Sequence, residues 1–165
     1  MDVTEPTDAG SVADPIDVVE RVWREVGPDA LRLAAALVGP HDAHDVMAAA
    51  FVRVAAHRDW AEIGDRRAYL MRAVRNEAQN LYRTRGRRWQ RDLAAVRPAS
   101  HKDTHVDVDV YRVLANLSLR QRSVVFMAYW HDMTEAEIAD VLELSRGTIH
   151  RDLRMARDRL RKDLT

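Results

Sequence analysis

Side chains that can contact nucleic acid are concentrated at the start of a helix that we predict near the carboxyl end of the chain. Five of them share the face opposite the apolar stripe of this helix: Arg146, Thr148, His150, Arg151 and Arg154. Guanidinium, hydroxyl and imidazole groups near a helix N-terminus suit the major groove of DNA. We expect Gly147 to let the helix backbone come close to a neighbour. The pattern favours DNA recognition, although a charged solvent face on an ordinary helical bundle is the alternative.

Two helix starts and a short turn must position that face. Thr134 and Glu137 match a capping box, so the sequence predicts a short helix that begins at residue 135. Ser145 is a good N-cap for the second helix. Apolar residues then recur at helical steps and predict a buried stripe: Ile149, Leu153, Ala156 and Leu160. Together these signals predict a helix-turn-helix.

Charge is strongly segregated along the chain, although the net charge is zero. Residues 1–30 have a net charge of −6, whereas residues 66–97 hold ten arginines against two acids, a net charge of +8. Residues 145–165 have a net charge of +4. The local potential, and not the total charge, attracts phosphate. Two separate basic segments are therefore available for nucleic acid.

The first basic segment is a predicted helix from about residue 66 to residue 88. Its apolar stripe is Leu70, Val74, Ala78 and Leu81. The opposing side carries an aromatic residue and amides among arginines: Tyr69, Arg72, Asn76, Gln79, Asn80 and Arg83. This mixture suits stacking on unpaired bases and contact with their edges.

Helical patterns cover nearly all of the chain, which predicts an all-α fold. We expect the first helical segment to be split at Gly27-Pro28 and to stop at Gly39-Pro40. A third helix should run from an N-cap at Asp42 to about Arg58, and Ser118 with Gln121 opens another helix through a capping box.

Composition divides the chain into two small helical domains joined by a flexible linker. We expect a disordered acidic N-terminus over residues 1–15, a helical domain over 16–92, a linker over 93–108 and the helix-turn-helix domain over 109–165. The alternation from Val106 to Val110 could form a short strand, but a strand without a partner would be unstable.

Several function classes are disfavoured by composition. The chain has no cysteine, which excludes disulfides and thiol nucleophiles. There is no signal peptide and no apolar run long enough to span a membrane, so we expect a cytoplasmic protein. Histidine and aspartate clusters near His41 and His101 are interpreted as solvated, and no metal or other cofactor is expected. No phosphate-binding loop or nucleophile motif indicates an enzyme.

Motifs in both domains resemble those of the extracytoplasmic-function (ECF) sigma factors, two-domain bacterial transcription initiation factors. In the second domain they are Leu117 through Arg122, Thr134 through Ala139, Ser145 through Ile149 and Arg154 through Arg157. In the first domain they are Asp42 through Asp45, Phe51 through Arg53 and Tyr69 through Asn76. The likeness covers residues from about 16 to 163.

The resemblance implies two macromolecular partners, core RNA polymerase and promoter DNA, with an anti-sigma factor as a further partner. The clamp of the largest polymerase subunit would be contacted by Asp42, Asp45, Ala48, Ala49 and Val52. The minus-ten element would be melted by Trp60, Arg66, Arg67, Tyr69, Arg72, Arg75, Asn76, Gln79, Asn80 and Arg83. The recognition helix of the second domain would lie on the minus-thirty-five element. Both basic surfaces should then lie open to DNA.

One departure from the family pattern concerns the helix that would contact polymerase. Ala48, Ala49 and Ala55 stand where the family has glutamine, an acidic residue and an aromatic residue. The helix becomes apolar almost all round, which predicts deeper burial or a docked partner. We favour the interpretation that these substitutions are sequence drift that a large interface tolerates. Two alternatives to a sigma factor stay open: a sigma-like adaptor or decoy that binds a regulatory partner, and a simple helix-turn-helix repressor.

Overall fold

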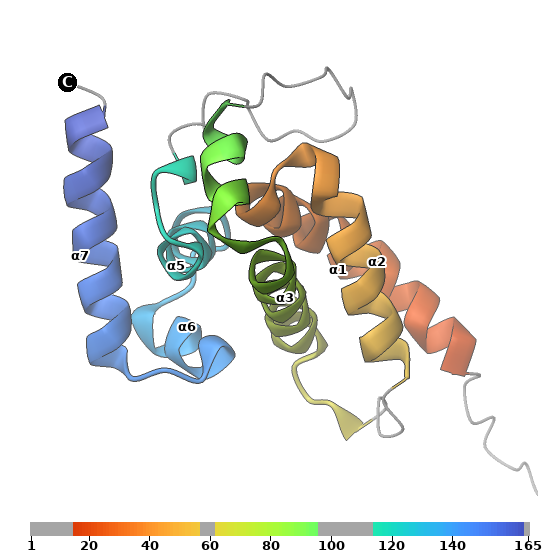
Figure 1. Ribbon diagram of the computed structural model, residues 1–165. Helices are drawn as coiled ribbons and strands as arrows, with labels where there is room; N and C mark the ends of the chain where they lie inside the picture. Colours follow the sequence, from red (N-terminus) through yellow and green to blue (C-terminus); the bar gives the residue numbers. More distant parts are fainter. Residues whose placement is uncertain (1–14, 57–61, 96–113, 164–165) are drawn as a thin grey trace, which may run out of the picture.

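The structure is a computed structural model that describes residues 15–56, 62–95 and 114–163. Its six labelled helices are α1 (Pro15–Val38), α2 (Pro40–Ala55), α3 (Arg66–Ala95), α5 (Leu119–Trp130), α6 (Glu135–Leu142) and α7 (Arg146–Asp163). Strands are absent from these described ranges, so the all-α prediction is confirmed. The first three helices pack together, and α5, α6 and α7 form a second group beside them (Figure 1).

Helix α1 continues through Gly27 and Pro28, so the predicted break there is wrong. A proline inside a helix costs about 3 kcal/mol, but the residues that follow it gain burial against α2 and α3. Leu33 and Leu37 are fully buried in this contact. Just before the proline, the Trp23 indole packs over Gly27 and meets the edge of the Phe51 ring at 4.8 Å between centroids. Tertiary packing therefore overrides the local break signal.

The chain turns sharply between α1 and α2. Gly39 has a φ of 86°, a left-handed conformation that favours glycine, and Pro40 follows as the first residue of α2. Asp42 is therefore not the N-cap that the sequence predicted. It lies in the first turn, 5% exposed, where its carboxylate accepts a 2.8 Å bond from Arg85 of α3.

Helix α3 is the long central helix of the first domain. Its predicted stripe is confirmed, because Leu70, Val74 and Ala78 are fully buried and Leu81 packs against the same core. The helix extends to Ala95 and so includes residues 93–95, the first three residues of the predicted linker. The rest of the predicted linker and residues 1–14 lie outside the described residues.

The second domain has the predicted helix-turn-helix, and all three predicted N-caps are confirmed. Ser118 and Thr134 each form a capping box, and Ser145 Oγ accepts from the backbone N–H of Thr148. Between α6 and α7 the chain reverses at Glu143, whose φ of 55° is left-handed. The expectation that Gly147 lets the backbone of α7 come close to a neighbour is wrong, since a Cβ atom added there would meet no other atom within 4 Å.

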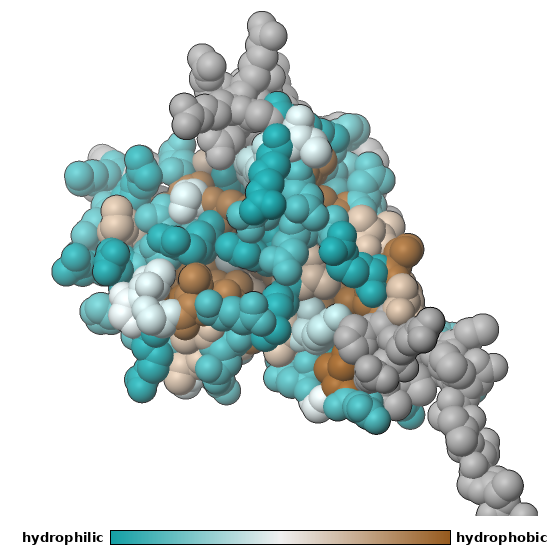
Figure 2. Space-filling view, turned by 60° about the horizontal axis from the view of Figure 1, so that its bottom comes forward, coloured by the Kyte–Doolittle hydropathy of each residue, from teal (hydrophilic) through white to brown (hydrophobic). Residues whose placement is uncertain are grey.

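The two domains share one hydrophobic core. Buried side chains of α1, α2 and α3 form a continuous cluster with those of α5, α6 and α7. Contacts between the domains run from α1 to α5 and from α3 to α6. When the molecule is turned so that the bottom of the view in Figure 1 comes forward, the visible surface is mainly hydrophilic, with small separate hydrophobic patches (Figure 2).

Candidate nucleic-acid interface

The predicted recognition face of α7 is open. Arg146, Arg151 and Arg154 are exposed, and within the described ranges none of the three forms a hydrogen bond or ion pair. Two neighbours are held in place: Thr148 Oγ1 lies 2.9 Å from Ser145 Oγ, and His150 Nδ1 lies 3.1 Å from a carboxylate oxygen of α6. The face therefore presents three unpaired guanidinium groups on a helix whose N-terminus is held by its cap.

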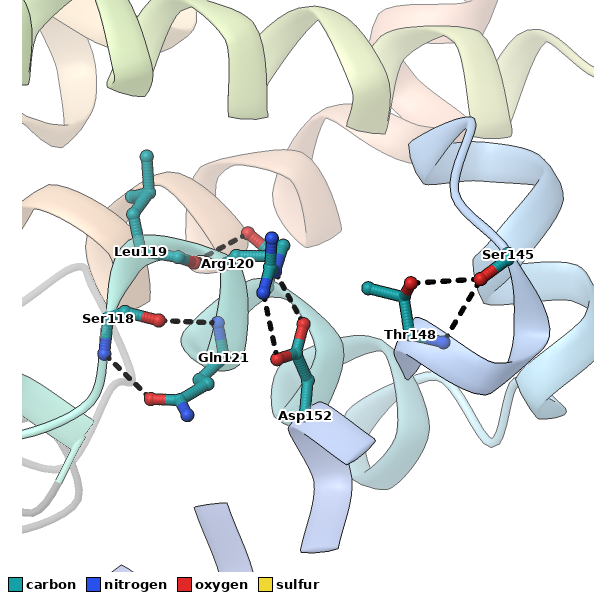
Figure 3. Close-up of polar contacts among 8 residues, drawn as sticks. Ser118, Leu119, Arg120, Gln121, Ser145, Thr148 and Asp152 are labelled. Carbon is teal, nitrogen blue, oxygen red and sulfur yellow. Dashed lines mark hydrogen bonds and ion pairs between the residues drawn. The ribbon is translucent and has the colours of Figure 1, made fainter. Parts of the chain in front are cut away.

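A partly buried ion pair, in which Asp152 is buried and Arg120 is exposed, attaches α7 to α5. Arg120 donates from Nε and Nη2 to the two carboxylate oxygens of Asp152, at 2.5 and 3.1 Å (Figure 3). Asp152 is 2% exposed, and the neighbouring Ile149 and Leu153 fill the core. A bidentate ion pair of this kind fixes the relative orientation of the two side chains as well as their distance. It sets the direction in which the recognition face points.

The predicted minus-ten surface on α3 is only partly open. Asn76, Asn80 and Arg83 are exposed, while the others are partly buried, apart from Arg67. Arg67, although exposed, contacts His131 of the second domain. Trp60 lies outside the described residues. The partly buried positions all lie on α3: Arg66, Tyr69, Arg72, Arg75 and Gln79.

Arg72 of α3 binds the carboxyl end of α6 in the other domain. Its Nε donates to Val141 O at 2.8 Å and its Nη2 to Asp140 O at 3.1 Å, while Nη1 pairs with Glu143 at 2.7 Å. The last carbonyls of a helix lack partners within the helix, and its dipole favours a cation at that end. Arg72 therefore acts as a C-terminal cap supplied by the first domain.

Arg122 of α5 makes the reciprocal contact with the carboxyl end of α1. Its Nη1 donates to Leu37 O at 2.6 Å and to the Tyr82 hydroxyl at 2.9 Å, and Nε donates to Leu117 O at 3.0 Å. Arg122 is 3% exposed. Its motif in the sequence predicted no role for Arg122, because Leu37 and Tyr82 belong to the first domain.

A third contact between the domains is centred on His131, whose side chain is 3% exposed. The Arg67 guanidinium donates to His131 Nδ1 at 2.5 Å and pairs with Asp29 at 3.5 Å. Burial, followed by the charge of Arg67, holds the pKa of His131 below its ordinary value, against the opposing effect of Asp29. The imidazole is therefore stable here in its neutral form.

These contacts correct the expectation that both basic surfaces lie open. The α7 surface is free, whereas α3 is covered at Arg67 and Arg72 by the second domain. The physical reason is that arginines suited to phosphate are also good partners for helix carbonyls, histidine and carboxylates. In this arrangement the domain contact occupies groups that the sequence assigned to DNA.

The predicted polymerase contact on α2 is exposed except at its first residue. Asp45, Ala48 and Ala49 are exposed and Val52 is 68% exposed, which excludes the deeper burial that the alanines had suggested. Asp42 was wrongly included in this surface, since it is buried against Arg85. What remains is a helix face of small apolar side chains without a partner in the described part of the chain.

Neither a metal centre nor a membrane span is found among the described residues. Those ranges contain no group of three or more histidine, aspartate or glutamate side chains placed to hold a metal ion. No helix within them has both the length and the apolar character needed to cross a bilayer.

Sequence profiles of two families match the chain, one in each domain. The profile of Sigma-70 region 2 matches residues 22–88, which span α1 to α3. The profile of Sigma-70, region 4 matches residues 107–160, which include α5, α6 and most of α7.

Known proteins of one kind resemble the chain over most of its length. An RNA polymerase sigma-E factor of Streptomyces avermitilis is 35% identical over 144 residues, covering 81% of this chain and 78% of that protein. The sigma-E factor of Streptomyces coelicolor is 34% identical over 146 residues, with the same coverage of 81% and 78%. A co-crystal structure of the sigma factor RpoE with the anti-sigma factor NepR from Bartonella quintana is similar in fold, with a TM-score of 0.69 at 25% identity, covering 88% of this chain and 95% of that one. With both sigma regions in order on one chain, whose described residues form helices and no strands, this protein belongs to the ECF sigma factors, which bind core RNA polymerase and direct promoter-specific transcription initiation.

Proposed function

We propose that this ECF sigma factor reads the minus-thirty-five element with α7 and melts the minus-ten element with α3, after its two domains separate. The observation that carries the proposal is the contrast between the two basic surfaces. The α7 face has three exposed arginines without partners among the described residues, whereas Arg67 and Arg72 of α3 bind the second domain. The closed arrangement is thus a resting form of the factor.

The recognition face is ready for a major groove in the closed form. Arg146 lies in the first turn of α7, Arg151 and Arg154 follow in the next two turns, and all three are exposed. The open space beside Gly147 leaves the helix backbone free to approach a phosphate. Arginine binds guanine with two parallel hydrogen bonds, so one or both of the later arginines would read bases.

The α3 surface requires opening before it meets DNA. Residues 96–113 join the domains, and an extended segment of this length spans roughly 60 Å. Separation would release Arg67 and Arg72 beside Tyr69, Asn76 and the other assigned residues. Stacking on aromatic and guanidinium planes, at about 1–3 kcal/mol per base, would then offset the cost of unpairing.

The exposed face of α2 supports docking on the clamp of core polymerase. Ala48, Ala49 and Val52 offer apolar area without long polar side chains, and Asp45 lies beside them. Arg85 and Asp42 fix the start of this helix through their ion pair. Under this proposal the protein acts in the cytoplasm and carries out no catalysis itself, since polymerase performs the chemistry.

A partner of the anti-sigma type belongs to the same proposal. It is supported by the likeness to a sigma factor that was crystallised with an anti-sigma factor. The second candidate, an adaptor or decoy with weak polymerase binding, is supported by the alanines that replace polar residues on α2. A pull-down with core polymerase separates the two, because stoichiometric binding eliminates the decoy.

Run-off transcription with reconstituted holoenzyme tests the proposal, with promoters selected from a random library. Arg151→Ala and Arg154→Ala should reduce specific product, and the loss should depend on the minus-thirty-five sequence. Arg159→Ala is the matched control, since it removes an exposed arginine of α7 that is not among the assigned residues. If both variants transcribe like the parent, the assignment of the reading face is wrong, and failure of the parent to yield any specific product contradicts the proposal as a whole.

A further inference from the structure

A polar hollow of about 510 Å³ lies where α3 of the first domain passes the N-terminus of α5 in the second. Arg75, Gln79 and Arg83 line it from α3, while the N-cap residue Ser118 and Arg120 line it from the start of α5. Figure 3 shows the start of α5 with Ser118 and Arg120 below the green ribbon of α3. None of the described residues that line the hollow is acidic. Its volume is that of a site for a small molecule.

Positive charge in the hollow is only partly neutralised. Arg120 is paired with Asp152, but Arg83 forms no ion pair within the described ranges. The Nε of Arg75 is buried and lacks a hydrogen-bond partner in that part of the chain, and its Nη1 reaches only the neutral amide of Asn76 at 3.2 Å. A buried donor without an acceptor is costly, so a ligand that accepts from it would be favoured.

Two further features favour an anion. Burial, followed by the nearby charges of Arg120 and Arg83, lowers the pKa of Arg75, because desolvation and like charges both disfavour its charged form. The twelve-residue helix α5 begins at the hollow, so its first backbone N–H groups and the positive end of its dipole lie there. Ser118 Oγ already accepts from the N–H of Gln121, so the preceding N–H groups of the first turn stay available.

We propose that this hollow binds the phosphate group of a small molecule, and that the bound phosphate holds the two domains together. Arg75 and Arg83 would contact it from one domain, while the start of α5 would contact it from the other. A ligand that binds the closed form better than the open form shifts the population toward the closed form. The site therefore couples a phosphorylated small molecule to the availability of the α3 surface, which goes beyond promoter recognition.

Isothermal titration of the full-length free protein with inorganic pyrophosphate tests the site directly. We expect saturable binding that sodium chloride at equal ionic strength does not reproduce. Arg75→Gln and Arg83→Gln should each weaken binding about tenfold or more, because each removes a charged donor. Arg83 is exposed, so Arg83→Gln tests the site even if Arg75→Gln perturbs folding. The control is Arg159→Gln, which removes the same charge from α7 away from the hollow and should bind like the parent.

The coupling to domain closure has its own readout. In a protein labelled at His44→Cys on α2 and Asp158→Cys on α7, pyrophosphate should raise the urea concentration at which energy transfer between the labels is lost. Absence of saturable binding, binding unaffected by both arginine variants, or binding without this rise overturns the proposal. Binding of a single-stranded oligonucleotide but not of pyrophosphate also overturns it, since the hollow would then be part of the DNA surface. Neither assay contains polymerase or a promoter, so the result is independent of the transcription test.

Discussion

Replacing Arg72 with alanine should weaken the contact between the domains by about 2–3 kcal/mol. Two hydrogen bonds from a cation to helix carbonyls, at 2.8 and 3.1 Å, contribute about 1 kcal/mol each once partial exposure is allowed for. The pair with Glu143 adds at most about 1 kcal/mol, because the two side chains are 32% and 70% exposed. At about 1.4 kcal/mol per factor of ten, the ratio of open to closed molecules should rise roughly 30- to 150-fold.

Energy transfer between a dye on α2 and a dye on α7 measures this change. The chain contains no cysteine, so His44→Cys and Asp158→Cys give two specific labelling sites, both of which are exposed. Urea titration followed by energy transfer reports opening, and far-UV circular dichroism reports unfolding of the helices. Arg72→Ala should lower the urea concentration at the midpoint of the energy-transfer titration. The expected shift is the loss of free energy of domain contact divided by the m-value, the slope of that free energy against urea concentration. If opening and unfolding coincide, the same 2–3 kcal/mol, derived from the bonds above, is lost from the unfolding free energy.

The control must lose an arginine ion pair that does not cross between the domains. Arg53→Ala meets this condition, since Arg53 of α2 pairs with Glu77 of α3 at 2.7 Å and is 65% exposed. It should leave the midpoint of energy transfer nearly unchanged. A midpoint for Arg72→Ala equal to that of Arg53→Ala would refute the view that Arg72 holds the closed form by capping α6.

Three further predictions concern single side chains. Tyr82→Phe should lower the free energy of unfolding in urea by about 1–2 kcal/mol, because its hydroxyl donates to Leu37 O and accepts from Arg122; no change would show that water replaces both bonds. The pKa of His131 in the folded state lies below its ordinary value of 6.5, so the stability that the neutral imidazole contributes is present above pH 6.5 and is lost as the pH falls below it. His131→Gln should remove this part of the pH dependence of the free energy of unfolding in urea. A pH profile identical to that of the parent would contradict the lowered pKa. Gly147→Ala should raise the free energy of unfolding by up to about 1 kcal/mol, since the added methyl group has free space and alanine favours helix. If the same variant loses promoter binding by the holoenzyme, DNA lies beside the backbone at residue 147. Unchanged binding would place the DNA elsewhere.

Local sequence signals determined where most helices begin and which faces they bury. Both capping boxes, the N-cap at Ser145 and the stripe from Ile149 to Ala156 are present as predicted, because they depend on residues three or four positions apart. The exposed reading face on α7 follows from that stripe. The break predicted at Pro28 failed because burial of α1 against two other helices outweighs one lost hydrogen bond.

Only the tertiary structure decided which arginines are free. Sequence periodicity placed Arg72 on the polar side of α3, but it could not show that the carboxyl end of α6 lies against that side. Nor could it assign Arg122 to Leu37, 85 positions away along the chain, or place Arg75 and Arg120 around one hollow. Helix formation depends on near neighbours, whereas the partner of a long cationic side chain depends on which helix ends the fold brings within its reach.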